Sequence, residues 1–191
     1  MANICDNYYE IEFSSEEKAK EFSRLLNKLF EEKGGWIDFL CDEVEIDKTY
    51  RLYTSEWIDI IDYYGGNNVI IATSSKWTPC IRLWDCIIKK VDPQAKFYYE
   101  TIEPDGGIFY SNSPLYIGEY AVDYWDEDQI PVHTLEAGTR DKDQVYEFLK
   151  ELFNSSDESF EELLNKFNQS EYSYNMFIHE IEEKAIEDWH F

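Results

Sequence analysis

Carboxylates are the residues of this sequence whose type and spacing could do chemistry. The chain holds 41 Asp and Glu against 17 Lys and Arg, a formal charge of −24. Three groups are spaced closely enough to share a divalent cation: Asp59 with Asp62, Asp123 with Asp126 and Asp128, and Glu180 with Glu183 and Glu187. The last group recurs at i, i+3 and i+7 of an expected helix, a pattern more typical of a solvated face. The segment 126–128 lacks the glycine and terminal glutamate of an EF-hand loop.

Motifs for other catalytic chemistry are absent from the sequence. His133, His179 and His190 occur singly, and no HExxH, GxSxG, P-loop or GxGxxG pattern is present. The four cysteines lack the paired spacing of a zinc site. Because no signal-like segment precedes them, we expect reduced thiols in a cytoplasmic protein. The sequence thus predicts no cofactor and no metal, and it favours a function other than catalysis, with an enzyme as an alternative.

The acidic charge is concentrated toward the C-terminus. Residues 119–191 contain 20 acids and 5 bases, whereas residues 1–118 contain 21 and 12. Direct binding to nucleic acid or to an anionic membrane is disfavoured, because phosphate contacts need Lys and Arg. A dense acidic field instead attracts a basic protein partner. The competing interpretation is that the charge only keeps the protein in solution.

The first 125 residues alternate strand-like and helix-like patterns. A capping box at Ser14–Glu17 begins an amphipathic helix that Gly34-Gly35 ends, and a second helix begins at Thr78-Pro79 and ends at Asp92-Pro93. Strands are expected over residues 4–13, 69–73, 96–102, 108–110 and 116–124. Residues 43–53 have the pattern of a strand pair or of one strand with an irregular start, and residues 57–64 fit either a strand or a short helix. This order predicts an α+β fold, a ferredoxin-like split βαβ antiparallel sheet with two helices on one face.

Residues 126–191 have the composition of an acidic helical extension. Three amphipathic helices are expected, at Gln144–Phe153, after a capping box at Ser155–Glu158, and at Tyr172–Trp189. We therefore expect two parts: a ferredoxin-like domain over residues 1–125 and a helical extension over residues 126–191, packed on or beside it.

Short motifs in the first part resemble those of the YubB-like family of uncharacterised phage and plasmid proteins. Met1–Asn7 is similar to its M-x-N-x-C-x-N start, and Ser75–Pro79 resembles its T-K-W-x-P segment at the mouth of the second helix. Tyr98–Glu100 and Gly106–Phe109 resemble its hairpin, Y-x-E then G-x-x-F. The resemblance implies a ferredoxin-like domain and a mobile-element setting, but no activity. Tyr110-Ser111 replaces the glycine usual after the hairpin Phe, and the acidic tail has no counterpart in the family.

Two aromatic features could bind nucleic acid. Lys76-Trp77 precedes an expected helix N-terminus, a position that can hold an anion, although an aromatic anchor packing sheet onto helix is the favoured interpretation. Phe97, Tyr98 and Tyr99 resemble the stacking residues of RNA-recognition sheets. However, Glu100 follows them where a Lys or Arg side chain would be needed to contact phosphate. RNA binding is therefore not expected.

The leading hypothesis is a phage or plasmid inhibitor of a host nucleic-acid-binding defence enzyme, an anti-CRISPR or antirestriction protein. Its carboxylates would occupy a basic nucleic-acid groove. Alternatives are a catalytically acting or metal-dependent nuclease-type inhibitor, or a plain accessory interaction protein. The expected partner-binding residues are Asp123, Asp126, Asp128, Asp157, Glu158, Glu161, Glu162, Glu180, Glu183 and Glu187.

Overall fold

The computed structural model describes residues 3–47, 55–105 and 107–189 of an α+β protein. The chain divides into two compact units. The first unit comprises residues 1–113 and 184–191, and the second unit comprises residues 114–183. Each unit has its own cluster of buried apolar side chains. Among the described residues, no helix is both long and apolar enough to cross a lipid bilayer.

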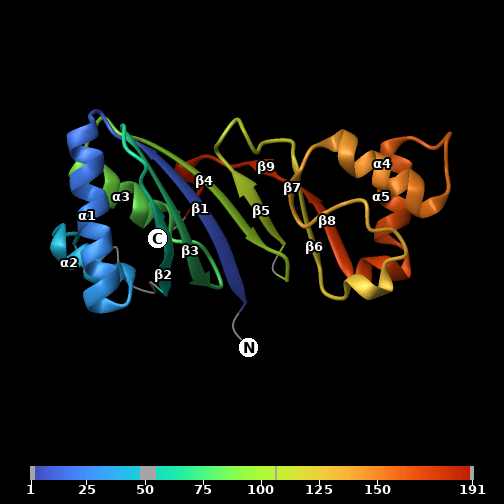
Figure 1. The fold of residues 1–191 in the computed structure, drawn as a ribbon, viewed down its shortest axis with the longest axis horizontal. Coiled ribbons are helices and arrows are strands. Elements are labelled where there is room, and N and C mark those ends of the chain that lie inside the picture. Colours follow the sequence, from blue (N-terminus) through green and yellow to red (C-terminus); the bar gives the residue numbers. More distant parts are fainter. Residues whose placement is uncertain (1–2, 48–54, 106, 190–191) are drawn as a thin grey trace. The chain divides into compact units, whose positions relative to one another are not determined.

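The first unit is built on an antiparallel sheet (Figure 1). Its strands are β1 (Ile4–Glu12), β2 (Glu56–Asp62), β3 (Asn68–Lys76), β4 (Lys96–Glu103) and β5 (Ile108–Ser111). They lie in the order β2-β3-β1-β4-β5, and each of these neighbouring pairs is antiparallel. The segment 57–64, which the sequence left open between strand and helix, is largely strand β2. The segment 43–53 lies in part outside the described residues.

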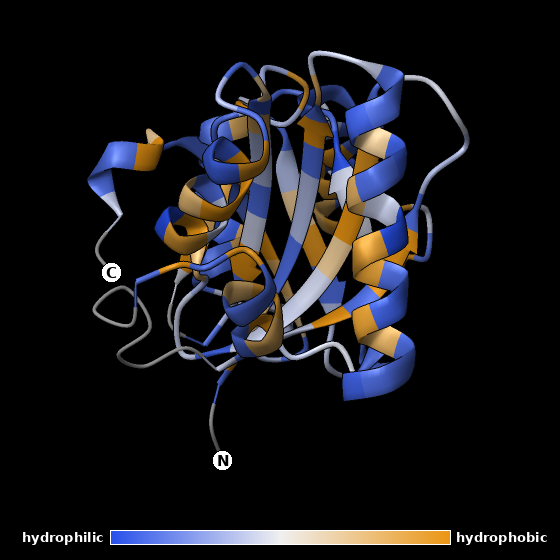
Figure 2. Cartoon of the chain, turned by 90° about the vertical axis from the view of Figure 1, so that its left-hand side faces the viewer, coloured by the Kyte–Doolittle hydropathy of each residue, from blue (hydrophilic) through white to orange (hydrophobic). Residues whose placement is uncertain are grey.

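Three helices belong to this unit, and α1 and α3 lie on one face of the sheet (Figure 1). They are α1 (Glu16–Lys33), α2 (Ile37–Glu43) and α3 (Ile81–Val91). Ser15 caps α1 by accepting from the Lys18 amide, and Gly34 ends it with a φ of 69°, a left-handed angle that suits glycine. Figure 2 shows hydrophobic and hydrophilic residues alternating along the helices, as in amphipathic helices.

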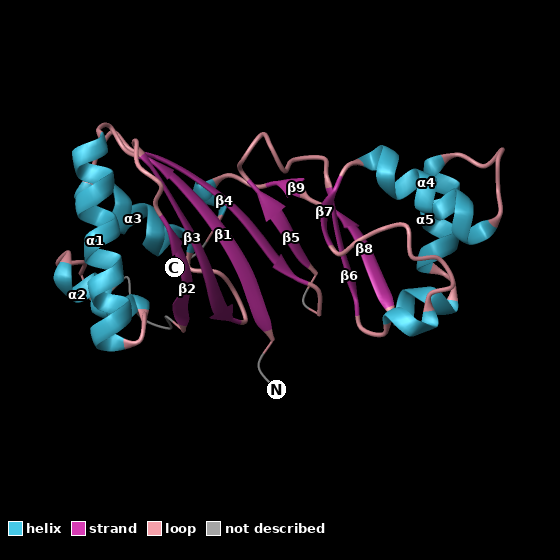
Figure 3. Ribbon diagram, viewed as in Figure 1, coloured by secondary structure: helices cyan, strands magenta, loops and turns pink. Residues whose placement is uncertain are grey.

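The second unit pairs a small sheet with two helices (Figure 3). Its strands β7 (Gly138–Arg140), β6 (Tyr120–Tyr124) and β8 (Met176–Glu180) lie in that order, all antiparallel. Its helices are α4 (Lys142–Phe153) and α5 (Phe160–Asn168), each begun by a capping box. The short elements are η2 (Glu127–Gln129), η3 (Glu171–Tyr174) and β9 (Glu182–Glu183), while η4 (Ile186–Asp188) belongs to the first unit.

The prediction of a third helix in the extension, at Tyr172–Trp189, is wrong. Its apolar residues fit a helical period, but the segment pairs with β6 as strand β8. Met176 and Ile178 point into the core of the second unit, and Ile178 lies opposite Val122. Long-range pairing therefore overrides the local pattern. The acidic extension is thus a mixed α+β unit that begins at Pro114, and the chain returns to the first unit at Lys184.

Candidate acidic interaction surface

The first group of expected partner-binding acids lies at the end of β6 in the second unit. Asp123 is exposed on the strand, and its Oδ1 accepts from the Tyr124 amide at 2.8 Å. Asp126 directly precedes η2 and Asp128 lies within it, and both side chains are exposed. The three carboxylates are thus close along the chain and face solvent, as the sequence indicated.

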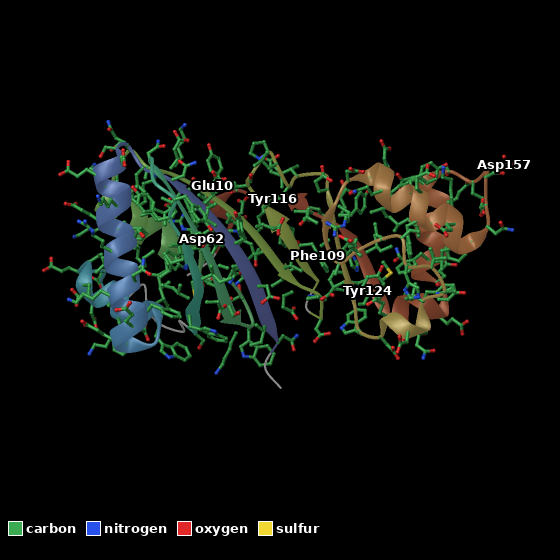
Figure 4. All side chains as sticks on the ribbon, viewed as in Figure 1. Glu10, Asp62, Phe109, Tyr116, Tyr124 and Asp157 are labelled. Atoms are coloured by element: carbon green, nitrogen blue, oxygen red, sulfur yellow. The ribbon has the colours of Figure 1, made fainter. Side chains whose placement is uncertain are left out.

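The second group surrounds the start of α5. Asp157 is exposed on the loop between α4 and α5 (Figure 4). Glu162 completes the capping box, accepting from the Ser159 amide at 2.8 Å, and this hydrogen bond lowers its pKa. Glu158 accepts from Ser155 and pairs with Lys166, and these contacts lower its pKa too. These carboxylates therefore help to hold the helix start as well as charging the surface.

The third group does not form the helical face that its spacing indicated. Glu180 ends strand β8, Glu183 lies in β9, and Glu187 lies in η4 of the first unit. All three are exposed. Because no helix carries them, the expected i, i+3, i+7 face does not exist.

Every basic side chain of the second unit is paired with a carboxylate. All residues from 114 to 183 are described, and they include 18 acids but only 4 bases. Each base lies within 4 Å of an acid, in the pairs Arg140–Glu136, Lys142–Glu161, Lys150–Glu147 and Lys166–Glu158. The remaining carboxylates therefore leave a large negative excess on this unit.

The three lysines of the second unit are also held against aromatic rings. Lys142 Nζ lies 4.4 Å from the centroid of Phe160, and Lys150 and Lys166 lie at 4.7 and 4.8 Å from Tyr146 and Phe153. Cation–π contacts of this kind hold an ammonium group over a ring. They favour the positions in which the lysines neutralise their own carboxylates.

A broad concavity of about 1200 Å³ lies in the second unit. Its lining includes Asp143, Glu147 and Glu151 of α4, together with Glu136 and Asp141. The three α4 residues recur at i, i+4 and i+8, and all are exposed. We call them the α4 stripe. The sequence hypothesis did not include them: Glu147 and Glu151 lie inside the expected helix at Gln144–Phe153, and Asp143 lies one residue before it.

The α4 stripe has a spacing suited to a basic chain. Residues four apart on a helix are separated by about 6 Å along its axis. Alternate side chains of an extended peptide are separated by about 7 Å. Like charges at i, i+4 cost a helix about 0.2–0.5 kcal/mol per pair. Lys150 pairs with Glu147 and offsets part of this cost, and Lys150 and Arg140 also line the hollow, so the row keeps a net negative charge there.

The described residues hold no group of three or more His, Cys, Asp or Glu placed to bind a metal ion. Asp59 Oδ2 instead accepts from the Ser74 hydroxyl at 2.6 Å. His133 Nδ1 lies 3.7 Å from Glu127, and His190 lies outside the described residues. The surface as described therefore offers electrostatic attraction of a cationic partner.

Comparison with protein-family models, with curated proteins and with solved structures finds no match for this chain.

Proposed function

We propose that this chain is a phage or plasmid protein that inhibits a host nucleic-acid-binding defence enzyme, as anti-CRISPR and antirestriction proteins do. The second unit would occupy the enzyme's basic nucleic-acid groove. One observation carries the proposal: all four bases of the second unit are engaged by its own carboxylates, while 18 acids surround them. Such a surface repels phosphate and attracts a Lys/Arg-lined groove.

The physical basis is competition for the same cations. A nucleic-acid groove binds phosphates through Lys and Arg, and each phosphate contact releases counterions. A folded unit with fixed carboxylates can make the same contacts without paying to order a flexible chain. The α4 stripe and the acids of η2 and of the α5 start supply the charges. Steering by this field raises the association rate and makes binding sensitive to salt.

A fold proposal accompanies the function. The order β1-α1-β2-β3-α3-β4 with strands arranged β2-β3-β1-β4 supports a ferredoxin-like first unit, elaborated by α2 and β5. The residues resembling the YubB-like family lie at matching places: Ser75–Pro79 joins β3 to α3, and Tyr98–Glu100 lies on β4. Met1, Ala2 and Gly106 of those motifs lie outside the described residues. These placements support a mobile-element origin and a cytoplasmic site of action.

The test begins in cells and ends with one purified enzyme. Bacteria carrying a restriction or CRISPR system receive a targeted plasmid with and without this chain. We expect the chain to restore transformation against at least one system. For that system's purified effector, fluorescence anisotropy then measures displacement of labelled nucleic acid by the chain at low and at physiological salt.

Two matched variants locate the surface. The first neutralises the α4 stripe as Asp143→Asn, Glu147→Gln and Glu151→Gln. The control neutralises three exposed carboxylates of α1, Glu21→Gln, Glu31→Gln and Glu32→Gln. We expect the first to weaken competition about tenfold and the control about twofold or less. Inhibition that is substoichiometric, indifferent to salt, or unaffected by the first variant would reject the proposal.

A companion variant tests the η2 acids. It replaces Asp123, Asp126 and Asp128 with Asn. Weakened competition would extend the binding surface to β6 and η2. Competition equal to that of the parent chain would restrict the surface to α4 and the α5 start.

A further inference from the structure

An apolar patch is exposed where the turn between α1 and α2 meets β2, the edge strand of the sheet in the first unit. Its five residues lie outside the buried core, and they are Phe30, Trp36, Phe39, Trp57 and Ile60. Phe30, Trp36 and Phe39 are 43, 42 and 37 % exposed, and Ile60 is 53 % exposed. We call these five residues the edge patch.

Close backbone packing fixes the rings of the edge patch in place. The Ile58 amide donates to the Gly35 carbonyl at 2.9 Å, which joins the turn between the helices to β2. Gly35 has a φ of 74°, and a Cβ there would lie 2.9 Å from the Ile58 carbonyl oxygen, so glycine alone permits this approach. Trp36 follows directly, with its ring centroid 5.5 Å from that of Trp57. A surface fixed in this way loses little conformational entropy when it binds.

The edge patch has the size of the centre of a protein interface. An aromatic side chain presents about 150–250 Å², so the exposed parts of Phe30, Trp36 and Phe39 alone amount to about 250 Å². With Trp57 and Ile60 the edge patch reaches the few hundred Å² that mark interaction sites on soluble proteins. A standard interface buries about 800 Å² on each partner, as an apolar centre within a polar rim.

The charges beside the edge patch balance, unlike those of the whole chain with its 41 acids and 17 bases. Residues 24–39 contain three bases and three acids, namely Arg24, Lys28, Lys33, Glu31, Glu32 and Asp38. Lys33 Nζ lies 5.6 Å from the centroid of the Phe39 ring, so a positive charge borders the rings themselves. On β2, Asp59 adds one carboxylate, which accepts from the Ser74 hydroxyl at 2.6 Å. A surface of mixed sign matches another of its own kind, whereas a basic partner is drawn to denser acids elsewhere.

We propose that the edge patch binds the edge patch of a second copy of this chain, in a two-fold symmetric dimer. Such an interface needs a surface that complements itself, because both copies contribute the same residues. Apolar rings at the centre and balanced charges at the rim meet this need. The inference concerns the first unit and does not rest on the proposed function.

Salt should strengthen this dimer. The net charge of −24 on each copy opposes association at long range. Salt screens charges that are separated by more than about 8 Å at 0.15 M, while contacts between apolar rings persist. Binding of the acidic surface to a basic groove should instead weaken with salt, so the two interactions respond in opposite directions.

Sedimentation equilibrium of the full chain measures this self-association. At about 0.5 M NaCl we expect the mass to rise from 22.8 kDa toward twice this value as the concentration increases to about 100 µM, a range that detects micromolar dissociation constants. We expect the association constant to be about tenfold lower at 0.05 M NaCl.

Tryptophan variants locate the interface. Trp36→Ala should weaken self-association about tenfold or more, as loss of a central tryptophan does, and Trp36→Phe should weaken it less. The control is Trp125→Ala, at a tryptophan of the second unit that is 55 % exposed, and it should leave self-association within about twofold. Trp77 is less suitable because it follows β3, the strand beside β2. At 61 % exposed, Trp77 is not the anchor between sheet and helix that the sequence favoured. Thermal unfolding checks that each variant is folded.

A charge exchange tests that the partner is a second copy. Lys33→Glu leaves two bases and four acids in residues 24–39, a net charge of −2, and should weaken self-association severalfold. Adding Glu32→Lys restores neutrality and should restore most of the association. Lys20→Glu makes the same charge change earlier on α1, outside this segment, and should have a smaller effect.

Several outcomes would overturn the proposal. They are a mass of 22.8 kDa under all conditions, self-association that Trp36→Ala leaves intact, and self-association that weakens with salt. A monomer that binds phosphatidylcholine vesicles through Trp36 would assign the edge patch to a lipid surface, and one that binds trilysine through Trp36 would assign it to a basic partner. Either result would also overturn the proposal. None of these readouts depends on inhibition, so the proposed function and this inference can fail separately.

Discussion

The indole Nε1 of Trp84 donates to Glu56 Oε1 at 2.7 Å, and both side chains are fully buried. The same oxygen accepts from the hydroxyls of Tyr9 and Thr73 at 2.8 and 2.5 Å. Oε2 accepts from the Cys80 amide at 2.9 Å. One carboxyl thus ties the edge strand β2 to β1, β3 and the start of α3. Burial nevertheless raises the pKa of Glu56, because all four donors are neutral.

Replacing this carboxyl tests its role in stability. We expect Glu56→Gln to lower the free energy of unfolding by about 1–2 kcal/mol near pH 5, since an amide NH₂ brings two hydrogens among four donors, whereas a protonated carboxyl brings one. A carboxyl whose folded-state pKa lies above its unfolded value contributes most at low pH, and this contribution is lost as pH rises through the folded pKa. The deficit of the variant should therefore shrink from pH 5 to pH 8.

Urea unfolding of both proteins across this range measures the deficit. Glu21→Gln, an exposed change on α1, is the control and should show a deficit near zero throughout. A Glu56→Gln deficit that grows with pH would mean that the buried carboxyl is stabilised as an anion.

The contribution of the Asp92–Lys18 ion pair to the free energy of unfolding has the opposite pH dependence. Burial alone would raise the pKa of Asp92, but hydrogen bonds from Lys18 Nζ and the Ser14 amide, both at 2.8 Å, hold it well below its usual range. A depressed folded pKa gives stability that is present above the unfolded pKa and lost as pH falls through the folded one. Asp92→Asn should cost about 1–3 kcal/mol at pH 7.

The cost of the same variant should begin to shrink below about pH 4, the range in which an unfolded aspartate becomes protonated, and should disappear only as pH falls through the depressed folded pKa. Thermal unfolding at pH 7, 5 and 3 gives the comparison. A cost that stays constant over these three values would assign the effect of Asn to packing instead of charge.

Local signals account for the parts of the fold that the sequence predicted. The Gly34 end of α1 and the Asp92 end of α3 depend on residues adjacent to each helix, so the sequence indicates them directly. The start of α1 is predicted only to within one residue, because Ser15 caps the helix in place of Ser14. Strand β8 is different. Its residues satisfy a helical period as well as a strand period, and only the distant partner β6 decides between them. Glu56 is also unpredictable, because its four donors come from three other elements.

The candidate surface was predictable in composition but only partly in position. Acidic density toward the C-terminus is a property of the sequence itself, and Asp126 and Asp157 are exposed as expected. The helical face expected for Glu180 and Glu187 is wrong, because β8 and η4 replace the helix. Acids on the outer face of an amphipathic helix are ordinary, so the sequence alone does not single out the α4 stripe, and only the concavity beside it makes Glu147 and Glu151 distinctive.

Neutralising the carboxylates at the two ends of the α4 stripe should change the stability of the protein in opposite directions. Asp143 lies in the first turn of α4, where the helix dipole favours an anion, whereas Glu151 lies in the last turns. Asp143→Asn should therefore lower stability and Glu151→Gln should raise it, each by about 0.3–1 kcal/mol at low salt. Both effects should fade near 1 M salt. Thermal shifts measured at two salt concentrations provide the test.

A stabilising Glu151→Gln that also weakens displacement of nucleic acid would show that the charge is kept for binding at the expense of stability. A change of the same sign at both positions would contradict the dipole argument. Glu171→Gln, exposed in η3 and outside the stripe, serves as the charge-matched control.

The C-terminal segment is fastened to the first unit by Trp189. Its Nε1 donates to the Tyr99 hydroxyl at 2.6 Å, and that hydroxyl donates to the Lys184 carbonyl at 2.6 Å. Burial raises the pKa of Tyr99 to about 12, so the hydroxyl keeps its proton throughout the neutral range. Lys184 Nζ lies 3.6 Å from the centroid of the Trp189 ring, and the indole is 7 % exposed.

Removal of this ring should therefore cost far more than loss of its hydrogen bond. We expect Trp189→Ala to lower the free energy of unfolding by about 3–5 kcal/mol, the cost of deleting a buried aromatic side chain. Trp189→Phe keeps a ring and should cost less, with about 0.5–1.5 kcal/mol from the lost hydrogen bond. Trp125→Ala, at a tryptophan that is 55 % exposed, is the control in the same urea experiment. If Trp189→Ala costs no more than Trp125→Ala, residues 184–189 do not stabilise the first unit.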